Sequence, residues 1–136
     1  MAKVFELTGN IGRNLVTDTT LVFPNVLTCV AVVAVSGARL VGAHVTQADA
    51  SRLSEVGKKV KEVAGLASDI YVIGNILPRY NVNSFANFGG RVRIHNCPGS
   101  IDVRASLDGG SVKFEKKLIS EPETDYQEIP TSQFQG

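Results

Sequence analysis

The hydrophobic and polar positions of the chain follow two different periods, which separate strands from a single helix. A mostly β-branched apolar run covers residues 26–35, which is typical of a strand buried on both faces. Residues 39–45 follow after a short turn, so the two segments predict an antiparallel hairpin connected through residues 36–38. Residues 69–77 form a further apolar run and predict another buried strand.

Between these strands the period changes, and the change predicts a helix. Apolar residues recur at steps of three and four, which gives one apolar face on a helix of about 18 residues. The face is formed by Leu53, Val56, Val60, Val63 and Leu66.

The last third of the chain returns to strict alternation of polar and apolar residues. Such alternation is typical of half-exposed strands, and Asp108-Gly109-Gly110 predicts a tight hairpin between two of them. The three strands are expected at residues 91–95, 101–107 and 112–114. Together the elements predict an α+β fold, a largely antiparallel sheet or sandwich covered by one main helix. Residues 1–119 are expected to form a single domain, and residues 120–136 an extended or flexible C-terminal tail.

Composition narrows the classes of function. The chain has 136 residues, enough for one ordinary domain. Its net charge of +1 argues against a large basic surface for nucleic acid, and no apolar run is long enough to insert in a membrane. No signal-peptide pattern is found at the amino terminus, so we expect a cytosolic protein. The composition leaves the oligomeric state open.

The two cysteines and two histidines contain no Cys-x-x-Cys pair, so neither a structural metal nor another cofactor is expected. A disulfide framework is not expected either, although a single Cys29–Cys97 bridge stays open. His95 and Cys97 are interpreted as part of a polar turn before Pro98.

Cys29 and His44 are the strongest candidates for a catalytic role. A hairpin turn centred on Ser36-Gly37 places Cys29 directly opposite His44 on the neighbouring strand. Directly opposed residues share a face and have Cβ atoms about 5 Å apart. A histidine at that distance can take the proton of a thiol and so create a nucleophile for acyl transfer. The alternative interpretation is that Cys29 is a small buried hydrophobic residue and His44 a polar residue at a strand end.

A family resemblance favours the catalytic interpretation. The stretch LTCVAVV at residues 27–33, followed by LVGAH at residues 40–44, resembles the core of the CheD-type chemotaxis receptor glutamine deamidases. It is similar also to the catalytic domain of the cytotoxic necrotizing factor toxins, which share the order Cys then His and deamidate a glutamine of Rho-type GTPases. The resemblance covers residues 20–76. It implies a cysteine-dependent deamidase that converts a glutamine side chain of a protein substrate to glutamate.

Two positions depart from the CheD pattern. CheD-type proteins carry a catalytic Thr six residues before the Cys, where this chain has Phe23, and Thr28 stands where the family has Ser or Gly. The missing Thr favours the toxin or effector members of the fold, which would be delivered into the cytosol of a target cell. The group that orients His44 or forms the oxyanion site is left open: a backbone carbonyl, as in the necrotizing factors, or one of the candidates Thr28, Asn25, Thr20 and Thr46.

Two other functions stay open at the level of the sequence. A cysteine protease or transglutaminase would use the same Cys29–His44 pair with a different acceptor. A non-catalytic interaction module would instead use a face of the sheet or the long loop at residues 79–90 to bind a protein partner.

Overall fold

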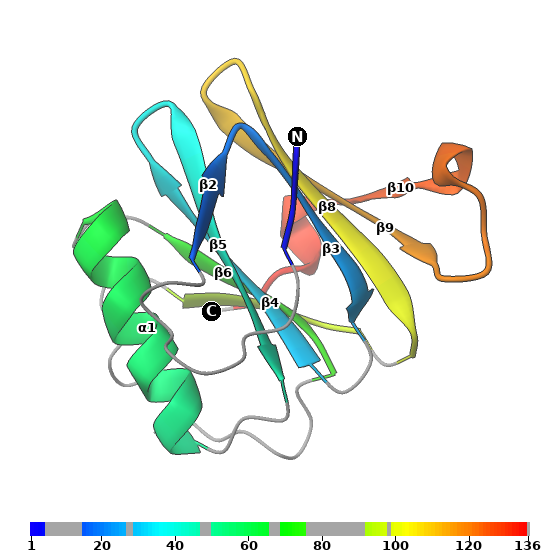
Figure 1. Cartoon of the computed structure of the whole chain (residues 1–136). Helices are drawn as coiled ribbons and strands as arrows, with labels where there is room; N and C mark the ends of the chain where they lie inside the picture. Colours follow the sequence, from blue (N-terminus) through cyan, green and yellow to red (C-terminus); the bar gives the residue numbers. More distant parts are fainter. Residues whose placement is uncertain are drawn as a thin grey trace.

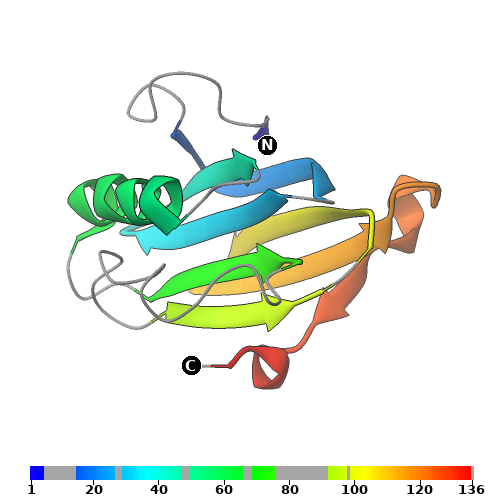
Figure 2. The same ribbon diagram turned by 90° about the horizontal axis from the view of Figure 1, so that it is seen from below.

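The chain forms two five-stranded sheets packed face to face, with one α-helix among the described residues on the outer side of one sheet (Figures 1 and 2). The computed structural model describes residues 1–4, 15–26, 29–46, 50–65, 69–75, 92–97 and 99–135. The α+β class predicted from the sequence is confirmed. Both sheets are mixed, because β1 pairs in parallel with β3 and β6 pairs in parallel with β7.

Sheet A has the strand order β1-β3-β8-β9-β10. Its strands are β1 (Ala2–Lys3), β3 (Thr20–Val26), β8 (Ile101–Asp108), β9 (Ser111–Leu118) and β10 (Gln127–Ile129). The predicted hairpin at Gly109-Gly110 is confirmed, with φ angles of 59° and 88° at the two glycines. Positive φ at both loop positions is the requirement of a type I′ turn, which glycine meets without strain.

Sheet B has the strand order β2-β5-β4-β6-β7. Its strands are β2 (Val16–Asp18), β5 (Arg39–Thr46), β4 (Cys29–Ser36), β6 (Ile70–Gly74) and β7 (Val92–Asn96). The predicted hairpin of β4 and β5 is confirmed, but its loop is Gly37-Ala38 alone, because Ser36 and Arg39 still pair. Gly37 has a φ of 60°, as the first loop position of a type II′ turn requires.

Strand β4 is buried on both faces, as its unbroken apolar run predicts. Val30, Val32 and Ala34 face α1 (Ala50–Ala64), which packs on them through Val56 and Val60. The alternate residues of β4, Ala31 and Val33, face sheet A and belong to the larger core between the sheets. Side chains that alternate in this way are expected of a central strand covered on both sides.

The C-terminal residues, for which the sequence predicts an extended or flexible tail, are packed against the domain. β10 adds to the edge of β9 in sheet A, and Gln135 pairs with Ile94 of sheet B, so this segment joins the two sheets. Phe134 is 6 % exposed and packs against the rings of Tyr71 and Phe114, at centroid distances of 5.5 and 5.1 Å. A buried aromatic residue therefore helps to fix this polar segment to the core.

Across the described part of the chain, no helix has the length and apolar character needed to cross a bilayer.

Candidate functional site

Cys29 and His44 lie on the same face of sheet B, but the strands pair two residues out of the predicted register. Because the hairpin is centred on Gly37-Ala38, Cys29 pairs with Thr46, and His44 pairs with Ala31. The expectation that Cys29 and His44 are directly opposite is therefore wrong, since it placed the turn one residue too early. The two are diagonal neighbours, for which Cβ atoms are about 7 Å apart and long side chains still meet.

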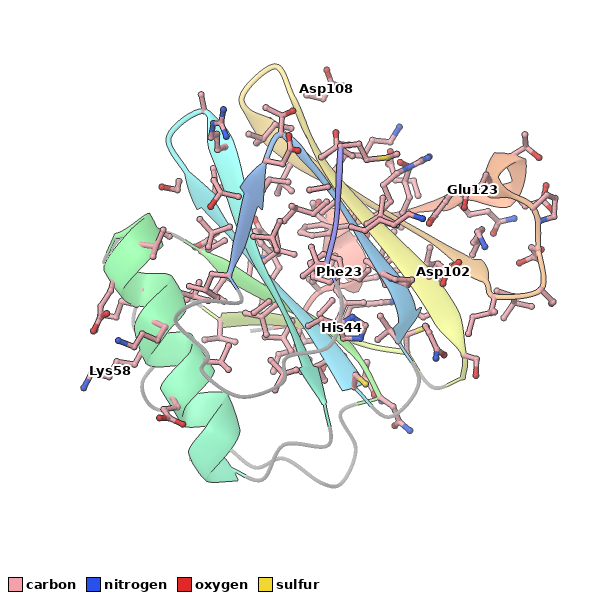
Figure 3. The ribbon with its side chains drawn as sticks, in the orientation of Figure 1. Phe23, His44, Lys58, Asp102, Asp108 and Glu123 are labelled. Carbon is pink, nitrogen blue, oxygen red and sulfur yellow. The ribbon has the colours of Figure 1, made fainter. Side chains whose placement is uncertain are left out.

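This shared face is directed into the core between the sheets. Ala31 belongs to the inter-sheet core, and a cross-strand partner points to the same side, so His44 points toward sheet A. The ring of Phe23, on β3 of sheet A, meets the imidazole edge to face with centroids 6.1 Å apart (Figure 3). His44 is 0 % exposed and Cys29 1 % exposed.

A backbone carbonyl holds the imidazole in place. Nδ1 of His44 lies 2.9 Å from the carbonyl oxygen of Val4, at the end of the N-terminal strand β1. Val4 is held there because β1 pairs in parallel with β3 and the Val4 N–H donates to the carbonyl of Val22 at 2.7 Å. A carbonyl only accepts hydrogen bonds, so Nδ1 must carry the hydrogen and Nε2 the lone pair. In this tautomer Nε2 is the atom that can accept a proton.

We expect ¹⁵N NMR of the imidazole at pH 8 to show the Nδ1–H tautomer for His44. The physical reason is the Val4 carbonyl, which accepts from Nδ1 and would repel a lone pair there. The measurement is the pattern of two-bond couplings between the ring nitrogens and the protons on the ring carbons. The His44→Gln protein is used to assign the signals. An Nε2–H tautomer at His44 would contradict the geometry.

Phe23 stands at the position where CheD-type proteins carry a catalytic Thr. Phe23, six residues before Cys29, lies beside His44 and offers an aromatic ring instead of a hydroxyl. The Val4 carbonyl supplies the hydrogen bond that such a hydroxyl would make. Among the orienting groups that lie in the described part of the chain, a backbone carbonyl is the one that contacts the imidazole.

The other candidates for an orienting role lie elsewhere or outside the described residues. Thr20 begins β3, three residues before Phe23, and so lies about 10 Å away from it along the strand. Asn25 is an exposed bulge residue with a φ of 59°, and its N–H donates to Asp102 at 2.9 Å. Thr46 is opposite Cys29 in register, but its side chain is outside the described part, as is all of Thr28.

The candidate site lies near one end of the sandwich. β4 begins at Cys29, and β5 and β6 end beside it at Thr46 and Gly74. In Figure 1 this is the lower end, and the two hairpin turns are at the upper end. A cavity of about 300 Å³ lies toward the upper end, lined by residues such as Val112, Lys113 and Ile129 and by neither cysteine nor histidine. That cavity does not belong to the Cys29–His44 site.

A second histidine and cysteine come together on β7, where the sequence predicts only a polar turn. Nδ1 of His95 lies 3.2 Å from the carbonyl oxygen of Gln133, so Nε2 is an acceptor here too. Nζ of Lys116, on β9 of the opposite sheet, lies 3.2 Å from that Nε2 and 3.4 Å from Sγ of Cys97. Lys116 carries no signal in the sequence, because it is one of three lysines in β9.

The surroundings of His95 make its protonation unfavourable in the folded protein. Burial, and then the positive charge of Lys116, lower the pKa of His95 below its ordinary value of 6.5, although the Gln133 carbonyl acts in the opposite direction.

A histidine of depressed pKa makes the folded state sensitive to acid. The unfolded chain binds a proton at this residue at a higher pH than the folded chain does, so stability is fully present above pH 6.5 and falls below it. We expect the urea midpoint to decrease between pH 7.5 and pH 5.5 in the wild type, and to decrease less in His95→Gln. Equal decreases in both proteins would contradict this assignment.

Neither Cys29 nor Cys97 is part of a disulfide. The Cys29–Cys97 bridge that the sequence left open does not form, because β6 lies between their strands and separates their backbones by about 10 Å. A disulfide needs Cα atoms closer than about 7 Å. Within the described ranges, no group of three or more His, Cys, Asp or Glu side chains is arranged to hold a metal ion.

Comparison of the sequence with known proteins assigns no family. No protein-family model matches the chain, and no curated protein matches it either. The function proposed below therefore rests on the geometry of Cys29, His44 and the Val4 carbonyl.

Proposed function

We propose that the protein is a cysteine-dependent deamidase that converts a glutamine side chain of a protein substrate to glutamate. The observation that carries the proposal is the bond between His44 Nδ1 and the Val4 carbonyl, on the face of sheet B that also holds Cys29. It leaves Nε2 as a base on the same face as the Cys29 thiol, and in our proposal the two meet as in nucleophilic cysteine enzymes.

The proposed reaction proceeds through a thioester. Nε2 of His44 takes the proton of the Cys29 thiol, and the sulfur attacks the carbon of the glutamine carboxamide. The imidazolium returns the proton to the leaving nitrogen, and ammonia departs as the C–N bond breaks. His44 then activates a water molecule, which attacks the thioester and releases glutamate and the thiol. Backbone N–H groups near Cys29 would stabilise the oxyanion, and neither metal nor cofactor takes part.

The Val4 carbonyl limits how strongly the Cys29 thiolate and the His44 imidazolium form an ion pair. An uncharged carbonyl orients the imidazole but stabilises imidazolium less than a carboxylate does. The thiolate–imidazolium pair is therefore expected to form mainly during the reaction, when the substrate is in place.

Burial restricts how the substrate can approach. Cys29 and His44 are almost completely buried, and Cys29 begins β4, so we propose that a glutamine side chain enters at the Cys29 end of the sandwich. A single extended side chain with a terminal amide is narrow enough for such an entry. We propose a protein substrate in the cytosol, either of the producing cell or of a cell into which an effector or toxin is delivered. The added negative charge would switch that target.

Mass spectrometry of a treated lysate tests the function. A lysate is incubated with the wild type, with Cys29→Ser or with Cys97→Ser, and peptides are searched for Gln-to-Glu conversion. We expect one or a few sites converted by the wild type and by Cys97→Ser, and none by Cys29→Ser. Incorporation of an added primary amine at the same sites would show transglutamination instead. Absence of both modifications would favour a non-catalytic interaction module.

A further inference from the structure

Cys97, Lys116 and His95 form a side-chain cluster between the two sheets that the proposed deamidation does not use. Cys97 and His95 come from the end of β7, and Lys116 from β9 of sheet A. The Lys116 ammonium donates to both Sγ of Cys97 and Nε2 of His95, at 3.4 and 3.2 Å. We propose that Cys97 is a modification site, whose thiol is oxidised by hydrogen peroxide to a sulfenic acid.

The hydrogen bonds of the cluster fix the ammonium against the sulfur. The Gln133 carbonyl accepts from Nδ1 of His95, which leaves Nε2 as an acceptor for Lys116. Since two partners hold Nζ, the ammonium stays beside Sγ and does not extend into solvent. Cysteines next to lysine are the ones that oxidants attack selectively, since the thiolate is the reacting form.

The oxidation step is balanced by the peroxide itself. Sγ attacks one peroxide oxygen, an S–O bond forms, and the O–O bond breaks. The departing hydroxide takes a proton from the thiol or from Lys116 and leaves as water, so sulfur is oxidised by two electrons and peroxide is reduced. The ammonium can then hydrogen-bond the new oxygen. Cys97 is 8 % exposed and Lys116 half-buried, which leaves an approach for a reagent as small as peroxide.

The test uses the Cys29→Ser protein, in which Cys97 is the remaining cysteine of the chain. This protein is treated briefly with hydrogen peroxide and dimedone, a reagent that traps sulfenic acids, and the adduct at Cys97 is measured by mass spectrometry. We expect the adduct to form, and to form about tenfold more slowly when Lys116→Met is added. Lys113→Met is the matched control, because that lysine pairs with Glu128 instead and should leave the rate unchanged.

A second measurement needs no substitution at Lys116. In urea the ammonium no longer sits beside the sulfur, so trapping in the folded Cys29→Ser protein should exceed trapping in the unfolded chain at the same pH. A peroxide-dependent covalent link between Cys97 and Lys116, formed with loss of water, would also support the proposal, since it passes through the same sulfenic acid. Trapping that is no faster in the folded protein, or that is unchanged by Lys116→Met, would overturn it.

Discussion

Cys29→Ala and His44→Ala are each expected to lower the rate of glutamine deamidation by at least about a thousandfold. Removing Cys29 removes the nucleophile, and removing His44 leaves the thiol without the base that takes its proton. The double variant should be little worse than either single variant, because the two residues act as one unit. Ammonia release from the substrate found in the lysate, measured at saturating and at low substrate concentration, gives kcat and kcat/KM for each variant.

Cys97→Ala and His95→Ala are the matched controls, since they change the same residue types on the same face of sheet B. Both should retain activity within a few-fold of the wild type. A dead Cys97→Ala variant with an active Cys29→Ala variant would move the active site to β7. Circular dichroism of each variant separates loss of chemistry from loss of the fold, because Cys29 and His44 are both buried in the core.

Gly74→Ala is expected to lower the free energy of unfolding by roughly 3 kcal/mol or more. Gly74 ends β6 with a φ of 152°, and a Cβ there would lie 2.6 Å from the carbonyl oxygen of Cys29 and 3.2 Å from Cα of Val30. These are backbone atoms of the central strand, which cannot rotate away as the end of a side chain can. The strand would have to shift at Cys29, so deamidase activity should fall together with stability.

Gly99→Ala is the control for the effect of φ alone. Gly99 has a φ of 107°, and no atom lies within 4 Å of the place where its Cβ would be. The cost there should be the strain of a side chain in the left-handed region, about 1–2 kcal/mol. Urea unfolding measures how much free energy of unfolding each variant loses. Equal losses at both positions would show that contact with Cys29 and Val30 adds nothing.

The strands could be predicted from the sequence where local signals define them. Gly109-Gly110 marks its hairpin directly, and the apolar run of β4 indicates burial on both faces. The register of β4 and β5 was harder, because Ser36-Gly37-Ala38 fits a turn centred on either of two bonds. Only the type II′ geometry, with Gly37 in the first loop position, decides that Cys29 pairs with Thr46.

The partners of both histidines could not be predicted, for a different reason. Val4 and Gln133 act through their backbone carbonyls, which every residue possesses, so no residue type marks them. Lys116 reaches Cys97 across the gap between the sheets, and that contact depends on which strands face each other. The packing of the C-terminal segment could not be predicted because its composition is polar, while two buried residues, Ile129 and Phe134, fix it to the core.

The pairing of β1 with β3 has a consequence for the order of events during folding. Val4 meets His44 across 40 residues of chain, and Leu21 of β3 pairs with Ala105 of β8, so the sandwich is closed mainly by contacts between distant segments. Chains dominated by such contacts fold in milliseconds to seconds, because the entropy of closing long loops is lost before the contacts form. The β4–β5 hairpin, which is local, can form early and bring Cys29 near His44. The imidazole acquires its fixed tautomer only when the N-terminal strand docks, so Cys29 and His44 come together before the imidazole is oriented.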